Sequence, residues 1–410
     1  MNLRERLQVV KTIAKKQEPA PRQVFPQFPR DWTVVADGVL KRAEYVKFDR
    51  QNAADVASLA ILAPDFLPCL TIKGAPRFEP LVFFDFETTG LSGGAGTIAF
   101  LAAFGRFENT MNTLKITQYL LLDYPAERDF LEAVLPEFGA RTSSQSTPVK
   151  ANIVTYNGKC FDFQILRTCC FMNRLEPPIF NAVDLLHPCR RLWKRLLPSC
   201  SQASIESAVL GLDRIDDISG SLAPEIWFSF LKTGETDDLL RICAHNRRDI
   251  FGLASIFTAL EDISRDPLGA LFIDRESTAL RWRETLRRYA AFFEENCEKT
   301  EINRYWETSR RLLEAARDCP RAALALAVDL FKEGREAEGR RLLVSLSNGD
   351  APVSVKAQAL RRLAFDAEKR LRDIDAALTY LDAGLAMETS ASVRGYFERR
   401  RNRLLGKRGF

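Results

Sequence analysis

The sequence predicts an α/β domain built on a mixed sheet, followed by a region made only of helices. Short apolar runs typical of buried strands alternate with longer periodic segments between about residues 76 and 265. From about 270 to 410 the chain shows no strand pattern and reads as helical throughout. Three early strands followed by alternating strands and helices favour a mixed sheet with helices on its faces.

Residues 1 to about 75 are rich in proline, as in Glu18-Pro19-Ala20-Pro21 and again at Pro26 and Pro29. Proline fixes one backbone angle and removes a hydrogen-bond donor, so it opposes regular structure. We therefore expect this segment to form an extended arm or an irregular lobe that packs on the domain after it.

The strands of the α/β domain follow from apolar, aromatic or alternating runs, and its helices from longer periodic ones. The second strand follows a glycine turn at 93–96. The expected strands are Leu81 to Phe86, Thr97 to Phe107, Thr113 to Leu122 and Asn152 to Tyr156. The expected helices are Glu127 to Phe138, Phe161 to Asn173, 190–197, 201–210 and Asp237 to Ala259.

The helical region, about 270 to 410, is weakly self-similar. Leu326-Ala327-Val328-Asp329 recurs 37 residues later as Leu363-Ala364-Phe365-Asp366. Each copy precedes a charged turn and a second helix, which resembles tetratricopeptide repeats with their period of about 34 residues. A plain helical bundle is the alternative.

Composition indicates a chain that folds in a reducing compartment. The nine cysteines form no C-x-x-C pair, and an odd count favours free thiols. The N-terminus leads into no apolar segment that would indicate a secretory signal. The longest apolar run, about Ile98 to Phe104, is far short of the roughly 18 residues needed to cross a bilayer. We therefore expect a cytoplasmic protein with no membrane contact.

The basic charge is concentrated in the helical region. Residues 271–410 contain 28 Lys and Arg against 22 Asp and Glu, whereas the rest of the chain has 31 against 32. The last helix is the most basic segment, from Arg394 to Arg408. It is either a solvated final helix or a phosphate-binding surface that delivers substrate to a near-neutral domain.

Two carboxylates stand at the end of the first predicted strand. Asp85 and Glu87 are two residues apart, so they point to the same side of that strand. Adjacent carboxylates repel unless a cation neutralises them, and hard oxygen ligands suit Mg²⁺ or Mn²⁺. An acidic pair on a strand end that enters solvent is the alternative.

A third carboxylate, Asp162, follows a strand and a tight Asn157-Gly158 turn and opens a helix. The positive end of the helix dipole favours its charged form, so a capping role alone would also explain it. A fourth, Asp249, lies four residues after His245 on the apolar side of a later helix. A carboxylate there is costly unless it is paired or binds a metal; an ion pair with His245 is the simpler explanation.

Together these motifs resemble the DEDD superfamily of 3′→5′ exonucleases, which has a ribonuclease-H-like fold. The motifs are Asp85-Phe86-Glu87-Thr88, Asn157-Gly158 to Asp162, and His245 to Asp249. The stretch Asp85 to Thr97 and the segment Val183 to Pro188 narrow the resemblance to YprB-type bacterial proteins, some of which carry C-terminal helical repeats.

The resemblance implies that Asp85, Glu87, Asp162 and Asp249 hold two divalent cations, Mg²⁺ or Mn²⁺, that cleave a phosphodiester bond of DNA or RNA. It gives His245 the place of the general base, although three residues separate it from Asp249, the spacing of the subclass that uses tyrosine. Thr88 and Asn157 match positions that hold the terminal nucleotide. Asp184 matches a recurrent residue of the narrower family without a known role.

Three alternatives keep the fold. The first is a catalytically weak nucleic-acid-binding or scaffold protein whose protein partner binds the helical repeats. The second is an endonuclease or a transposase-like protein. The third is a purely structural protein whose repeats bind a protein partner and whose acidic cleft is incidental. The sequence leaves open whether the substrate is DNA or RNA and whether it is single- or double-stranded.

Overall fold

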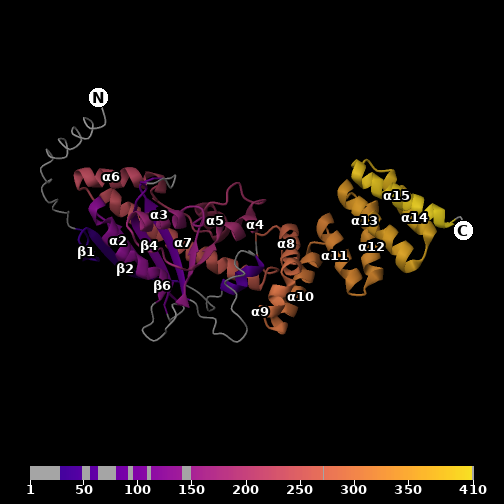
Figure 1. Cartoon of the computed structure of the whole chain (residues 1–410), viewed down its shortest axis with the longest axis horizontal. Coiled ribbons are helices and arrows are strands. Elements are labelled where there is room, and N and C mark those ends of the chain that lie inside the picture. Colours follow the sequence, from indigo (N-terminus) through magenta and orange to yellow (C-terminus); the bar gives the residue numbers. More distant parts are fainter. Residues whose placement is uncertain are drawn as a thin grey trace, which may run out of the picture.

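The structure is a computed structural model that describes residues 28–48, 56–62, 80–90, 96–108, 112–140, 149–270 and 272–408. An α/β part is followed by a helical part that extends away from it along the long axis of the molecule (Figure 1). Within the described ranges, every helix is too short or too polar to serve as a membrane span.

The α/β part is built on a seven-stranded sheet in the order β1-β2-β5-β4-β3-β8-β9. Its strands are β1 (Trp32–Ala36), β2 (Val39–Lys47), β3 (Leu81–Thr88), β4 (Ala99–Phe107), β5 (Thr113–Leu121), β8 (Asn152–Thr155) and β9 (Asn181–Asp184). In this order, every neighbouring pair from β1 through β2, β5 and β4 to β3 is antiparallel. Strand β8 lies parallel to both of its neighbours, β3 and β9. The predicted mixed sheet is therefore confirmed. Two short strands, β6 (Gly139–Ala140) and β7 (Val149–Lys150), pair separately.

The structure differs from the expected arm or irregular lobe over residues 1 to 75, because β1 and β2 belong to the sheet. Strand β2 pairs with β5 along its whole length and alternates exposed with partly buried side chains. Charged residues occupy many of its positions, so its apolar signal is weak. Residues 56–61 form a short 3₁₀ helix, and 1–27, 49–55 and 63–79 lie outside the described residues.

Helices cover both faces of the sheet, as predicted. They are α2 (Glu127–Val134), α3 (Asp162–Met172), α4 (Leu186–Trp193), α5 (Gln202–Leu210), α6 (Ala223–Thr233) and α7 (Asp237–Arg265). Helices α2, α3 and α6 share one core with Phe84 and Phe86 of β3. Helices α4 and α5 and most of α7 share the other core with Phe83. The alternation of β3 thus decides which side chains face α7.

Helix α7 lies very close to strand β4, and Gly105 makes this approach possible. A Cβ atom at Gly105 would lie 2.6 Å from a methyl carbon of Ile250 on α7. The absence of a side chain lets the helix settle against the sheet and brings its polar residues near the end of β3.

The rest of the chain is all-helical, as predicted: α8 (Arg275–Arg288), α9 (Ala290–Asn296), α10 (Lys299–Ala315), α11 (Pro320–Lys332), α12 (Glu336–Asn348), α13 (Val353–Asp366), α14 (Ile374–Leu385) and α15 (Ala391–Arg408). From α11 onward each helix packs on the next. Both aspartates of the repeated motif bind an arginine from an earlier helix: Asp329 binds Arg283, and Asp366 binds Arg340. The tetratricopeptide-like assignment stays a prediction.

One apolar core continues across the expected boundary near residue 270. Trp282 and Leu286 of α8 belong to the same core as Phe257 and Leu260 of α7. The division into domains at that point therefore stays a prediction, since the first helices of the C-terminal part are packed on the α/β part.

Candidate active site

Strand β3 presents Asp85 and Glu87 toward α7. Phe84 and Phe86 point into the opposite core, so the residues between and after them share the α7 side. Glu87 is buried, and Asp85 is partly exposed. The register with β4 shifts by one residue directly after Glu87, between Glu87 and Thr88. The predicted pairing of the two side chains on one side is confirmed.

Asp162 is buried and stands at the start of α3, as predicted. The loop before it is fixed by Asp184, which is fully buried at the end of β9. One Asp184 oxygen accepts hydrogen bonds from the backbone amides of Asn157, at 2.8 Å, and Leu186, at 3.1 Å. Its other oxygen accepts from the amide of Lys159 at 3.2 Å. Asp184 is thus a positioning residue that shapes the turn leading to Asp162.

Replacing Asp184 with asparagine should lower the free energy of unfolding by about 2 kcal/mol, because an amide group cannot accept all three backbone hydrogen bonds and leaves a buried donor unpaired. Urea denaturation followed by circular dichroism measures the change. Asp350→Asn, at an exposed residue after α12, is the matched control and should change stability by less than about 0.5 kcal/mol. Equal stability of the two variants would remove the role given to Asp184.

Helix α7 contributes His245, Asn246 and Asp249. Asn246 is completely buried and donates from Nδ2 to Asp85 Oδ2 at 2.8 Å. Its own oxygen accepts from Gln118 of β5 at 3.0 Å. This chain of hydrogen bonds fixes the orientation of the Asp85 carboxylate. The sequence interpretation missed Asn246, although an amide side chain on the buried side of a predicted helix indicates a residue with a specific hydrogen-bond partner.

His245 lies between two carboxylates. Its Nδ1 donates to Asp217 Oδ2 at 2.9 Å, and its Nε2 lies 3.2 Å from Asp249 Oδ2. One ligand atom each from Glu87, His245 and Asp249 lie within 4.8 Å of one another, close enough for one metal ion. A Cβ atom at Gly220 would lie 3.0 Å from His245 Nε2, so the 213–222 segment closes over the imidazole.

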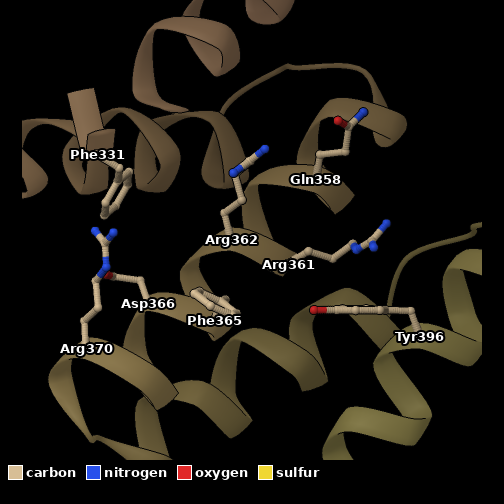
Figure 2. Close-up of a pocket in the computed structure, with 8 residues that line it drawn as sticks. All are labelled: Phe331, Gln358, Arg361, Arg362, Phe365, Asp366, Arg370 and Tyr396. Carbon is tan, nitrogen blue, oxygen red and sulfur yellow. The ribbon is translucent and has the colours of Figure 1, made fainter. Parts of the chain in front are cut away.

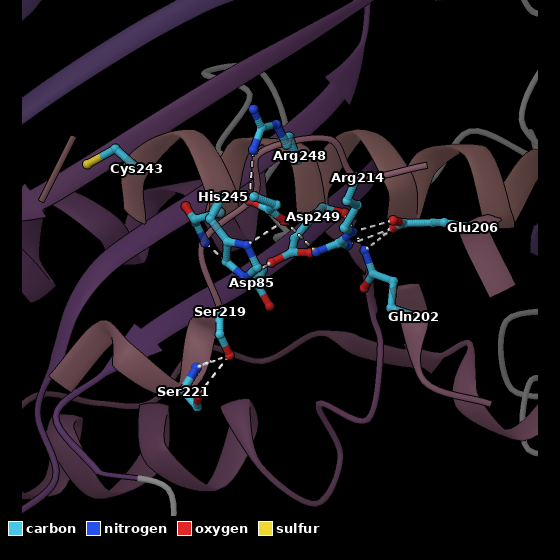
Figure 3. Close-up of polar contacts among 12 residues, drawn as sticks. Asp85, Gln202, Glu206, Arg214, Ser219, Ser221, Cys243, His245, Arg248 and Asp249 are labelled. Atoms are coloured by element: carbon cyan, nitrogen blue, oxygen red, sulfur yellow. Dashed lines mark hydrogen bonds and ion pairs between the residues drawn. The ribbon is translucent and has the colours of Figure 1, made fainter. Parts of the chain in front are cut away.

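Arg214 connects the site to a second acidic residue (Figure 3). Its guanidinium donates to both oxygens of Glu206, at 2.7 and 3.0 Å, and also to Asp249 Oδ1. Glu206 fits there because Gly252 has no side chain; a Cβ atom would lie 1.7 Å from Glu206 Oε1. Arg214 therefore competes with any metal ion for the charge of Asp249. The sequence interpretation missed it.

Burial and mutual repulsion shift the pKa values of the four predicted ligands upward. For Asp85, burial is the first cause, followed by the charges of Asp249, Asp162 and Glu87. For Glu87, burial comes first and then Asp249 and Asp162. Burial raises the pKa of Asp162 to about 7, and it also raises that of Asp249, against the effect of His245 and Arg214. The four carboxylates therefore form one electrostatic cluster.

The cluster has an excess of negative charge that a cation would compensate. In the described part of the chain, no lysine or arginine forms an ion pair with Asp85, Glu87 or Asp162. Arg248 is bound to Asp217, and Arg214 is shared between Glu206 and Asp249. Carboxylate oxygens at this proximity fit Mg²⁺ or Mn²⁺.

The two predicted substrate-binding residues also lie near the carboxylates along the chain. Thr88 is buried, and its hydroxyl donates to the carbonyl oxygen of Gly90 at 2.9 Å. Asn157 adopts a left-handed backbone conformation with φ of 66° in the turn fixed by Asp184. Their contact with a terminal nucleotide stays a prediction.

Residues 82–261 match the family model described as the RNase_H superfamily. The α/β part is a ribonuclease-H-like domain. Over 191 residues the chain is 37% identical to Uncharacterized protein YprB from Bacillus subtilis (strain 168). The aligned region covers 46% of this chain and 43% of that protein, so the similarity spans less than half of either.

The ribonuclease-H-like domain defined by this match contains all four predicted metal ligands and His245. It begins at β3 and ends within α7, so it includes neither β1 and β2 nor the helices after 265.

Proposed function

We propose that this protein is a metal-dependent nuclease that hydrolyses phosphodiester bonds as a 3′→5′ exonuclease of the DEDD type. One observation carries the proposal: Glu87 of β3 and His245 and Asp249 of α7 bring one ligand atom each within 4.8 Å of one another, and the charges of Asp85 and Asp162 act on this group. The 3′→5′ polarity rests on the resemblance alone. The cytoplasmic location predicted from the cysteines stays a prediction.

In the proposed site, Asp85, Glu87, Asp162 and Asp249 would hold two divalent cations. When bound, such ions would lower the pKa of a coordinated water and stabilise charge on the phosphate. The chain itself supplies the orientation of each carboxylate. Asn246 fixes Asp85, and the turn held by Asp184 fixes the start of α3 at Asp162.

His245 is in a position to accept the proton of the attacking water. Its Nδ1 is engaged by Asp217, which leaves Nε2 as the acceptor on the side of Glu87 and Asp249. The pairing with Asp217 also selects the ring tautomer and orientation. His245 is therefore proposed as the general base, with Asp217 as its positioning residue.

His245→Ala should lower kcat by about 10²-fold, as expected for the loss of one general base, and should leave the affinity for Mn²⁺ within about threefold. Single-turnover cleavage and calorimetric titration of Mn²⁺ measure the two quantities. A large loss of Mn²⁺ affinity would instead make His245 a metal ligand, and unchanged kcat would exclude both roles.

A cavity of about 680 Å³ beside the cluster could receive the substrate strand. It is lined by Arg214, Arg247 and Arg248, by the carboxylates of Glu206 and Asp213, and by apolar side chains such as Ile215 and Phe251. Each of the three arginines is already paired with a carboxylate, so a phosphate would have to displace one of these ion pairs. The aromatic face of Phe251 suits a base.

The proposal is tested with 5′-labelled DNA and RNA oligonucleotides, single- and double-stranded, incubated with Mn²⁺ or Mg²⁺. We expect a ladder of products shortened from the 3′ end, and no products in EDTA. Cleavage of a circular substrate would instead indicate an endonuclease. Intact substrates under all of these conditions would refute the nuclease.

The ion pair between Arg214 and Asp249 favours one alternative, a catalytically weak nucleic-acid-binding or scaffold protein. A guanidinium that permanently neutralises Asp249 would leave a metal ion one ligand short. Arg214→Gln separates the two cases: it should reduce cleavage if Arg214 only orients Asp249, and should increase Mn²⁺ affinity if Arg214 blocks the site.

A further inference from the structure

A second groove lies far along the chain from the carboxylates, in the helical part. Two adjoining cavities of about 480 and 310 Å³ share Gln358 and Arg362 in their walls. The side chains that line the two cavities come from α8, α11, α13 and α15 and from the turn after α13. The groove therefore runs across these four helices. Figure 2 shows the larger cavity, with arginine and aromatic side chains facing one another across it.

Helix α13 supplies the centre of this groove. Gln358, Arg361, Arg362 and Phe365 follow one another at intervals of three, one and three residues and therefore share one helical face. The opposite face of α13 holds the apolar core of the helical part through Leu360 and Leu363 among others. The face of α13 that lines the groove is thus polar, cationic and aromatic. The opposite face packs in the apolar core that stabilises the helical part.

Positive charge in the groove is only partly compensated. Arg283, Arg321 and Arg370 are each paired with a carboxylate, namely Asp329, Glu276 and Glu336. In contrast, Arg287, Arg361 and Arg362 have no carboxylate within ion-pair distance among the described residues. The pKa of Arg362 is lowered by partial burial and then by the charges of Arg283, Arg287 and Arg361. Clustered guanidinium groups that repel one another favour an anionic ligand.

Aromatic rings alternate with these cations. The guanidinium carbon of Arg361 lies 3.9 Å from the centre of the Tyr396 ring, and that of Arg370 lies 5.1 Å from the centre of the Phe331 ring. Phe365 lines the groove and is 49% exposed, whereas Phe331 and Tyr396 are partly buried. An exposed ring beside arginines provides a stacking surface for a base next to contacts for phosphates.

A solvated helix face would explain the arginines but gives no role to the rings that alternate with them. A peptide made of acidic residues would use the charge but brings no aromatic group to stack on Phe365. Asp366 also lines the groove, but its carboxylate is buried and held by Arg340. A ligand that combines anionic groups with flat rings is therefore favoured, and nucleotides carry both.

We propose that this groove binds single-stranded nucleic acid, with phosphates on Arg287, Arg361 and Arg362 and a base on Phe365. The inference deepens the proposed function, since it gives the nuclease a second, non-catalytic contact with its substrate. The preference is for a single strand because a base can stack on an aromatic side chain only where it is free of its partner strand.

Fluorescence anisotropy with a labelled single-stranded oligonucleotide of about 20 nucleotides, in EDTA so that no cleavage occurs, tests the groove. Arg361→Ala/Arg362→Ala should weaken binding at least about tenfold and make its salt dependence shallower, since about two phosphate contacts are lost. Phe365→Ala, at an exposed position, should weaken binding roughly five- to tenfold without unfolding the chain.

Arg311→Ala/Arg317→Ala is the matched control, because it removes two exposed arginines, one in α10 and one in the turn after it, that do not line the groove. At an ionic strength that screens long-range electrostatic attraction, this control should change the affinity by less than about twofold. Equal losses in the two double variants would overturn the proposal. So would a polyglutamate peptide that binds as tightly as the oligonucleotide and loses affinity in the same variants, which would make the groove a peptide site.

The binding experiment and the cleavage experiment can fail independently of each other. If the wild-type protein binds through the groove but cleaves none of the substrates, the proposed nuclease activity fails and the groove stands. If it cleaves them while the groove variants bind as well as the control, the groove fails and the nuclease stands.

Discussion

Asp85→Asn should lower metal-dependent cleavage by at least about 10³-fold while the protein stays folded. The substitution keeps the shape of the side chain but removes a charged ligand from a site whose chemistry depends on bound cations. The hydrogen bond that Asn246 donates to Asp85 can still be made by the amide oxygen. Initial rates on a 5′-labelled oligonucleotide with Mn²⁺, together with circular dichroism spectra, give the result.

The matched control is Asp262→Asn, which makes the same chemical change at an exposed position of α7. It should leave the rate within about twofold. Asp162→Asn and Asp249→Asn should resemble Asp85→Asn, because all three carboxylates belong to one cluster. Cleavage by Asp85→Asn at the rate of the control would mean that the activity arises elsewhere.

In the absence of metal, the protein should be less stable at pH 8 than at pH 5.5. A carboxyl group whose pKa is raised by folding keeps its proton over a range in which the unfolded chain releases it. The stability it contributes is present at low pH and is lost as the pH rises from about 4 through the folded pKa, about 7 for Asp162. Between pH 5.5 and 8 the loss from Asp162 alone is on the order of 2 kcal/mol, since about 1.5 pKa units lie in this range and each corresponds to about 1.4 kcal/mol.

Thermal unfolding in EDTA should therefore show a Tm lower by roughly 5–10 °C at pH 8 than at pH 5.5. Mn²⁺ should restore the Tm at pH 8 and have little effect at pH 5.5, where protons already neutralise the cluster. Asp85→Asn isolates the site from other titrating groups: without metal it should raise the Tm at pH 8 and reduce the response to Mn²⁺. A wild-type Tm at pH 8 that Mn²⁺ leaves unchanged would argue against a cation site.

The position of the acidic cluster could be predicted because it depends on simple periodicities. Alternation along β3 placed Asp85 and Glu87 on one side, and the helical period placed Asp249 on the buried side of α7. Asp162 lies near them only because β3 pairs in parallel with β8. The mixed α/β pattern predicts that such a parallel pair exists, but it does not predict which residues of the two strands face each other.

The charged groups around the cluster could not be predicted in this way. Arg214 and Asp217 lie in the acidic and basic run 213–217, which has the composition of a solvent-exposed loop. Their contacts with Asp249 and His245 depend on the path of the chain between α5 and α6, and no local pattern encodes that path. Strand β2 was missed for a related reason, since its exposed side carries charges that hide its alternation.

The measurement that most directly tests the central claim is a crystal structure of the protein soaked in Mn²⁺, with the ions located from their anomalous scattering. We predict anomalous peaks at coordination distance from the carboxylates of Asp85, Glu87 and Asp249, with Arg214 withdrawn from Asp249. A map without such peaks, in which Arg214 still binds Asp249, would contradict the assignment of these carboxylates as a metal centre.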